Sequence, residues 1–195
     1  MNEDLRRRLN RIHDRITAKD FLDSSGIGNE IAFFVFDYPP EEELGVREFI
    51  PILENKIRST KPDLRLVSIN LFRFLIDHLR DLNLLEESFR IQRERGNAAL
   101  LHAVKGLLNP EDVARRIVET ARPRDPNLML LHGVGSVYPL LRTHALLNNL
   151  HPVLDRIPLV LFFPGTYVHG EFCLFGGTER ATEERRYYRA LRLID

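Results

Sequence analysis

Four short runs of consecutive apolar residues mark the chain, and polar or charged segments separate them. Runs of this length that contain Val, Ile and Phe predict strands buried on both faces of a sheet. The run bracketed by prolines is the most apolar, and we expect it to form the central strand. The four runs are Pro158–Gly165, Ile31–Phe36, Leu64–Leu71 and Leu128–Leu131.

A second short run follows the central one and predicts a hairpin. Gly165–Gly170 has the composition of a turn, and Glu171–Phe175 is a further strand candidate that ends at Gly176-Gly177. Two runs joined by a loop of about six residues indicate neighbouring strands, which could be antiparallel.

Helical spacing of apolar residues separates these strands. Residues 3–17 place Leu5, Leu9, Ile12 and Ile16 on one face, and Glu41–Glu43 open a second helix that continues to a break at Lys61 and has Pro51 inside it. A third helix follows from the Leu71, Leu75, Leu79 and Leu82 spacing.

The second half of the chain predicts further helices. Glu86–Leu108 is expected to be helical with a break near Gly96. Asn109-Pro110 is a strong helix start, because Asn caps and Pro suits the first position. Another helix is expected directly after His132–Ser136, reaching about Leu150. Thr182–Ile194 is either a helix or an edge strand.

Strands that alternate with helices predict an α/β protein, a three-layer sandwich with a mostly parallel central sheet. We further expect a P-loop-NTPase-like topology that lacks the Walker A motif. The length of 195 residues predicts a single domain over residues 1–195,.

Composition narrows the function classes. The formal net charge is zero, which argues against binding nucleic acid through bulk charge,. Cys173 is the single cysteine, so no internal disulfide forms, and a cytoplasmic location fits,. The amino-terminal residues lack the apolar segment of a signal peptide, and no run is long enough to span a membrane.

The segment after the Ile31–Phe36 strand is the first candidate for a ligand site, because parallel α/β sheets bind ligands beyond the carboxyl ends of their strands. A P-loop would stand at Asp37–Glu43, but this segment holds two prolines and three glutamates, with no lysine for a phosphate,. We expect either an ordinary strand–helix connection or a degenerate nucleotide-binding topology used for interaction.

The segment after the Leu128–Leu131 run is a candidate anion-binding loop. Gly133, Gly135 and Ser136 could present backbone amides to an anion,. Tyr138 stands where a dinucleotide fingerprint would have its third glycine. A tight turn with Ser136 as helix cap is the alternative.

Other chemistry has little support. No metal motif or paired cysteine is present, and neither His169 nor Asp77-His78 has the partners of a catalytic site,. Cys173 is expected to be a small buried residue. Three arginine clusters, at 6–11, 90–95 and 185–192, favour solvated faces or protein contacts.

Several segments together resemble the BrxB family of BREX phage-defence systems. They are PLVLFFPGTY at 158–167, LFG at 174–176, YYRALRL at 187–193, HGVGSVYPLLR at 132–142 and FDYPP at 36–40. The resemblance spans most of the chain. It implies a component of a multi-protein system that methylates host DNA and blocks phage replication, with no established enzymatic activity, cofactor or catalytic residue.

The resemblance also implies partners. They are a PglZ-type alkaline-phosphatase-like protein and, further, an adenine methyltransferase and a large ATPase. The expected function is therefore a non-catalytic adaptor, with Tyr38, Tyr167, Tyr187 and Arg189 as candidate contacts. Whether the chain forms a homodimer stays open.

Two alternatives remain at this stage. One is a nucleotide or nucleic-acid sensor that uses the loops at the carboxyl ends of the strands. The other is a hydrolase built around His132 and the Gly165–Tyr167 turn.

Overall fold

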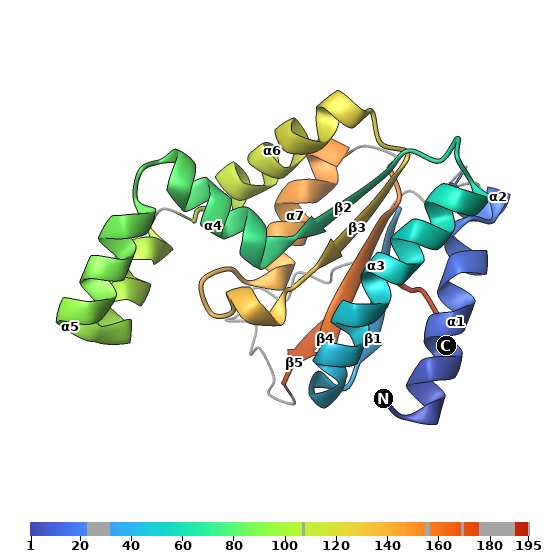
Figure 1. Ribbon diagram of the computed structural model, residues 1–195, viewed down its shortest axis with the longest axis horizontal. Coiled ribbons are helices and arrows are strands. Elements are labelled where there is room, and N and C mark those ends of the chain that lie inside the picture. Colours follow the sequence, from blue (N-terminus) through green and yellow to red (C-terminus); the bar gives the residue numbers. More distant parts are fainter. Residues whose placement is uncertain (23–31, 107, 155–156, 169, 176–189, 195) are drawn as a thin grey trace.

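The computed structural model describes residues 1–22, 32–106, 108–154, 157–168, 170–175 and 190–194. It is an α/β sandwich of three layers, in which α1 and α3 cover one face of the sheet and α4, α6 and α7 cover the other (Figure 1). The helices are α1 (Glu3–Ile16), α2 (Lys19–Leu22), α3 (Glu43–Thr60), α4 (Leu71–Asp81), α5 (Leu85–Lys105), α6 (Pro110–Ala121) and α7 (Thr143–Leu154). The strands are β1 (Phe33–Tyr38), β2 (Leu66–Asn70), β3 (Leu128–His132), β4 (Leu159–Val168), β5 (Glu171–Leu174) and β6 (Leu191–Arg192). Three 3-10 turns are η1 (Pro40–Glu42), η2 (Arg122–Arg124) and η3 (Gly135–Val137).

The sheet has the strand order β2-β3-β4-β1-β6, and these five strands are parallel. β4 lies in the middle, so the prediction that the Pro158–Gly165 run is central is confirmed. β5 pairs with the far end of β4 in antiparallel orientation. The mostly parallel α/β architecture is therefore confirmed, whereas the P-loop-like topology stays a prediction.

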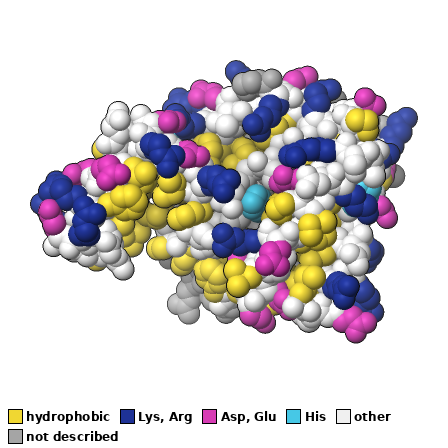
Figure 2. Space-filling view, viewed as in Figure 1, with side chains coloured by type: hydrophobic (Ala, Val, Ile, Leu, Met, Phe, Trp, Pro, Cys, Tyr) yellow, Lys and Arg dark blue, Asp and Glu magenta, His cyan; other side chains and the backbone are white. Residues whose placement is uncertain are grey.

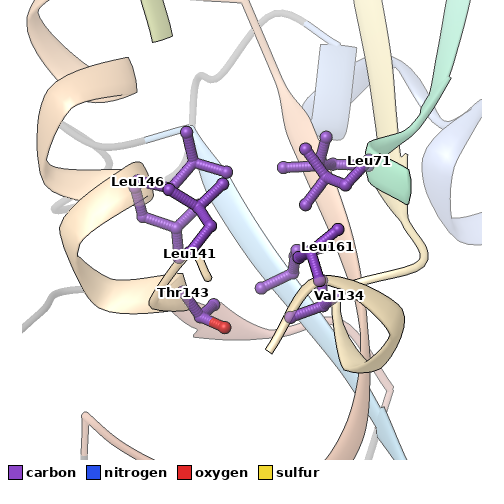
Figure 3. A pocket seen from close by; sticks show the side chains of 9 residues that line it. Leu71, Val134, Leu141, Thr143, Leu146 and Leu161 are labelled. Atoms are coloured by element: carbon purple, nitrogen blue, oxygen red, sulfur yellow. The ribbon is translucent and has the colours of Figure 1, made fainter. Parts of the chain in front are cut away.

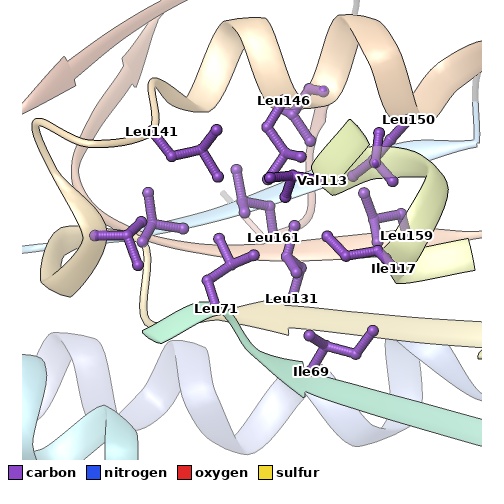
Figure 4. Close-up of a cluster of buried hydrophobic side chains, with 14 of the residues drawn as sticks. Ile69, Leu71, Val113, Ile117, Leu131, Leu141, Leu146, Leu150, Leu159 and Leu161 are labelled. Atoms are coloured by element: carbon purple, nitrogen blue, oxygen red, sulfur yellow. The ribbon is translucent and has the colours of Figure 1, made fainter. Parts of the chain in front are cut away.

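Side chains of β1 and β4 alternate between two hydrophobic clusters. Phe33 and Val35 face the cluster under α4, α6 and α7, which Figure 4 shows in close-up, and Phe34 and Phe36 face the cluster under α1 and α3. Because both faces of these strands are buried, their sequences are apolar throughout rather than alternating. This is the physical reason that the runs were recognisable.

The predicted helices form largely where expected. α3 is continuous through Pro51, which lies on its exposed side. The Asn109 side chain caps α6 by accepting a hydrogen bond from the amide of Glu111 at 3.1 Å. α5 breaks at Gly96, whose φ of +80° and ψ of 179° are accessible almost only to glycine,.

Two expected boundaries were wrong. The turn after the central strand is shorter than Gly165–Gly170, because β4 continues through Val168, where it pairs with Glu171. Gly165 makes this possible: a Cβ there would lie 2.1 Å from the carbonyl oxygen of Cys173 on β5. The composition of this segment predicts a turn, but Gly165 allows the backbones of β4 and β5 to pair closely.

The helix expected directly after Ser136 begins only at Thr143. Gly135–Val137 is a short 3-10 turn, and Tyr138 then has extended backbone angles. A residue before proline disfavours the helical region, so Pro139 separates the turn from α7.

The carboxyl-terminal segment was expected to be a helix or an edge strand. Leu191 and Arg192 form β6, which pairs with β1 at the edge of the sheet. Residues 182–189 lie outside the described part of the chain. Among the described residues, no helix has the length and apolar character that crossing a membrane requires.

Candidate functional site

The carboxyl ends of β1, β2 and β3 form one edge of the sheet, which we call the carboxyl edge. Tyr38, Asn70 and His132 are the last residues of these strands. In parallel α/β proteins this edge is the usual ligand site. The side chains of the carboxyl edge therefore decide what chemistry the fold can support.

Asp37, next to the end of β1, is the centre of a buried ion cluster. Its side chain is 7% exposed, and its two oxygens accept hydrogen bonds from Arg8 and Arg192 at 2.8 Å each. A third hydrogen bond comes from the backbone amide of Tyr167 at 3.1 Å. This cluster joins α1, β1, β4 and β6, so its role is to hold four elements together.

Both arginines of this cluster have further partners. Arg8 donates to the backbone oxygens of Asp37 and Ile194, and its guanidinium lies 4.9 Å from the centre of the Phe36 ring. Arg192 donates to the backbone oxygen of Tyr167 at 2.6 Å. Both arginines therefore bind the protein's own backbone as well as Asp37, which supports a structural role for the cluster.

The acids after β1 also bind parts of the protein itself. Glu42 accepts a hydrogen bond from the backbone amide of Asn2 at 2.7 Å. Glu43 accepts one from the hydroxyl of Tyr38 at 2.6 Å, and burial raises the pKa of that hydroxyl. The segment between β1 and α3 therefore connects strand to helix and fixes the start of α1.

His132, at the end of β3, lies in a positively charged environment. Burial, with Arg47 and Arg73 nearby, lowers its pKa from 6.5 to about 4. Its Nδ1 is 3.4 Å from the amide nitrogen of Asn70, while the oxygen of the same amide accepts a hydrogen bond from the backbone amide of Arg73 at 3.0 Å. At neutral pH this histidine is uncharged.

The predicted anion loop is packed against neighbouring residues. The amide of Ser136 donates to the carbonyl oxygen of Gly133, so this donor is already used within the turn. A Cβ on Gly133 would lie 3.1 Å from Asn70, and one on Gly135 would lie 2.9 Å from the ring of Phe175. Ser136 does not cap α7, which begins at Thr143. Anion binding by this loop stays an untested prediction.

The candidate partner contacts fall in different places. Tyr38 is 2% exposed and Tyr167 is 5% exposed, with its hydroxyl bonded to the backbone of Ala190. Both tyrosines therefore serve the interior of the fold. Tyr187 and Arg189 lie outside the described residues, so their role stays a prediction.

A narrow apolar hollow lies between β3, α4 and α7 (Figure 3). It is lined by Leu71, Val134, Leu141, Thr143 and Leu146 among others, and it is too small to hold a water molecule,. It belongs to the hydrophobic core and offers no ligand site.

Within the described ranges, no group of His, Cys, Asp and Glu side chains is arranged to hold a metal ion. Among the described residues, no hydroxyl or thiol forms a hydrogen bond with His132. The side chain within hydrogen-bonding distance of its ring there is the amide of Asn70. Cys173 is half-buried in β5 rather than fully buried as expected.

α5 projects beyond α4 at the end of the molecule remote from α1, and we call it the arm (Figure 1). Ser88 and Val104 are its buried residues, whereas Phe89 is 46% exposed. Apolar side chains are visible on the arm and on the adjoining part of the body (Figure 2). Exposed apolar surface on a projecting element is typical of a protein-binding site.

The sequence analysis did not identify the arm as an exposed surface, because its half-buried apolar residues have the same spacing as the buried residues of a core helix. It also missed Arg47 and Arg73, which lie far from His132 in sequence. Only the apolar strand before Asp37 signalled that this carboxylate would be buried.

Taken together, these features define a mostly parallel α/β protein whose carboxyl edge is tied by internal ion pairs and from which a helical arm with an exposed phenylalanine projects. The family described as BREX protein BrxB matches residues 67–193. A BREX protein BrxB of Bacillus cereus (strain H3081.97) is 35% identical over 192 residues, which cover 96% of each chain. One of Escherichia coli O9:H4 (strain HS) is 35% identical over 187 residues, 96% of this chain and 90% of that protein.

The chain therefore belongs to the BrxB family of BREX proteins. No solved structure matches it.

Proposed function

We propose that this protein is a non-catalytic adaptor of a BREX defence system that binds a PglZ-type partner protein through the arm. Family membership supports a role in BREX defence. The observation that carries the adaptor role is the arm itself, a projecting helical element with a large exposed aromatic residue.

The construction of the arm supports this reading. It breaks at Gly96 into two helical segments, and Gln92 donates to Asn97 across the break at 3.2 Å. Leu85 packs against the main core, so the base of the arm is anchored. Phe89 is four residues further along the helix and is exposed. An anchored base with an exposed aromatic residue provides a rigid interaction element.

The charged side chains of the arm leave its apolar face available. Arg90 forms ion pairs with Glu87 and Glu94 along the helix, at 2.6 and 3.1 Å. These exposed pairs add little stability, but they neutralise the polar side. A partner that covers Phe89 would thus bury apolar area without burying an unpaired Arg90.

Co-purification of the two purified proteins tests the proposal. A tagged PglZ-type protein should retain the chain at micromolar concentration, and a cross-linking map should place contacts on residues 85–105. Absence of a complex at that concentration would argue against the adaptor role. A complex that is cross-linked only through α1 or α3 would retain the adaptor role and reject the arm.

A further inference from the structure

β2 is an open edge of the sheet. Among the described strands it pairs with β3 alone, and it stands at one end of the order β2-β3-β4-β1-β6 (Figure 1). Proteins commonly protect such edges with lysine, proline or a bulge. The residues of β2, Leu66–Asn70, include neither a proline nor a charged side chain. An unprotected edge strand is a template for pairing with another chain.

The backbone groups of Ser68 point away from β3. Successive residues of a parallel strand direct their backbone groups alternately to the two sides, and of two residues in register only one directs them to the other. Met129 donates its amide hydrogen to the carbonyl oxygen of Pro158, just before β4, at 2.9 Å. Leu130 therefore directs its backbone groups to β2, where its register partner is Ser68. The amide and carbonyl of Ser68 consequently face the open side of β2.

The hydroxyl of Ser68 also lacks a partner. Val67 and Ile69 face the cluster under α4, α6 and α7, so Ser68 between them points to the face under α1 and α3,. Its hydroxyl oxygen is shielded from solvent, and among the described residues it has no hydrogen-bond partner. Buried hydroxyl groups are normally hydrogen-bonded, because an unpaired one costs free energy. An unpaired hydroxyl on an open edge strand indicates that a further strand supplies the bond.

The symmetry of β2 favours a second copy of the same chain as that strand. Ser68 is the middle residue of Leu66–Asn70, so a two-fold axis at Ser68 pairs β2 with its own copy in antiparallel orientation,. The two Ser68 side chains then lie on the same face with Cβ atoms about 5 Å apart, where rotation of each side chain brings the hydroxyls into hydrogen-bonding distance. The amide of each Ser68 donates to the carbonyl of the other, and the amide of Asn70 donates to the carbonyl of Leu66 in the second copy.

Charges beside β2 complement each other about the same axis. Asp63 precedes β2 by as many residues as Arg73 follows it, and both side chains are exposed. The axis brings the segment before one β2 toward the segment after the other, so Asp63 of each copy lies toward Arg73 of the second copy. Opposite charges across an interface favour this register over slipped ones.

We propose that two copies of the chain pair through β2 in antiparallel orientation, about a two-fold axis at Ser68, and so form one continuous sheet. The interface is small because β2 has five residues. A reversible dimer with a Kd of about 1–100 μM is therefore expected. This surface is separate from the arm, and the proposal does not depend on the adaptor role.

Sedimentation velocity of the purified chain at about 1–200 μM tests the dimer. Ser68→Pro removes an amide that points away from β3, so the ladder between β2 and β3 keeps its hydrogen bonds. Because both symmetric bonds of the dimer are lost, this variant should dimerise at least about 30-fold more weakly than the wild type. Circular dichroism checks that the variant is folded.

Charge reversal tests the register without touching β2. Asp63→Lys and Arg73→Asp should each weaken the dimer by about 3-fold or more at low salt, because each variant faces like charges across the axis. Asp63→Lys/Arg73→Asp restores opposite charges and should return the Kd to within about 2-fold of the wild type. The matched control Asp4→Lys reverses an exposed acid on α1 and should leave the Kd unchanged.

Three results would overturn the proposal. They are a chain that stays monomeric up to about 200 μM, a folded Ser68→Pro variant with the Kd of the wild type, and single reversals at Asp63 and Arg73 that dimerise no more weakly than Asp4→Lys. The charge reversals decide the question even if Ser68→Pro folds poorly.

Discussion

Replacement of Asp37 by alanine should destabilise the fold more than loss of any exposed acid. Its carboxylate accepts three hydrogen bonds, two of them from arginines at 2.8 Å. Its side chain is 7% exposed, against 18% for Arg8 and 38% for Arg192. The variant would leave both guanidinium groups without their carboxylate and the amide of Tyr167 without an acceptor.

The expected loss follows from the burial of the groups left behind. Breaking a buried ion pair by removing one partner costs roughly 3–5 kcal/mol. Arg192 is more exposed and can regain water, so we expect the lower end, about 3 kcal/mol. For a chain of this size, that corresponds to a fall in Tm of about 6–12 °C.

Urea denaturation followed by circular dichroism measures this loss. Asp77→Ala is the matched control, because its partner Arg80 is also an arginine but both side chains are more than half exposed. That control should lose no more than about 1 kcal/mol. If Asp37→Ala unfolds within about 1 kcal/mol of the control, the cluster does not hold the four elements together.

Three further predictions concern glycines and His132. In urea denaturation, Gly165→Ala should destabilise the protein by at least about 2 kcal/mol, because its Cβ would overlap the backbone of β5,. The control Gly45→Ala has ordinary contacts at 3.6 Å and should be neutral or stabilising by up to about 1 kcal/mol,. Stability should fall by about 3 kcal/mol as pH drops from 6.5 to 4, because unfolded His132 binds a proton that the folded protein excludes, and His132→Gln should flatten this part of the pH profile,. Gly96→Ala should speed hydrogen exchange in α5, since strain of roughly 1–3 kcal/mol falls on its break,.

Each of these predictions can fail clearly. Equal stability of the two alanine variants would show that β5 can move away from β4. An unchanged pH profile in His132→Gln would mean that another group titrates in this window. Unaltered exchange in α5 after Gly96→Ala would show that the break needs no glycine.

The sequence predicted the fold through burial. Strands covered on both faces are apolar at every position, so β1, β3 and β4 were visible as runs,. Apolar residues at steps of three and four likewise identified the buried faces of α1 and α3,. These signals are local, and they need no knowledge of what packs against them.

Features that depend on distant residues were not predictable in this way. Arg8 and Asp37 are 29 residues apart, and Arg192 and Asp37 are 155 apart. Gly165 has the composition of a turn, yet its close contact with Cys173 makes it a strand residue. The projection of the arm depends on where α4 ends, which no spacing of apolar residues encodes.

Affinity between the purified chain and the PglZ-type protein tests the adaptor function most directly. Calorimetric titration should give a micromolar or lower Kd for the wild type, and Phe89→Asp should weaken it by about 30-fold or more, as expected for loss of an aromatic hot spot. The control Ile52→Asp changes an apolar residue on α3 that is 64% exposed, against 46% for Phe89, and should bind like the wild type. No heat of binding for the wild type, or equal affinity of the Phe89 and Ile52 variants, would contradict binding through the arm.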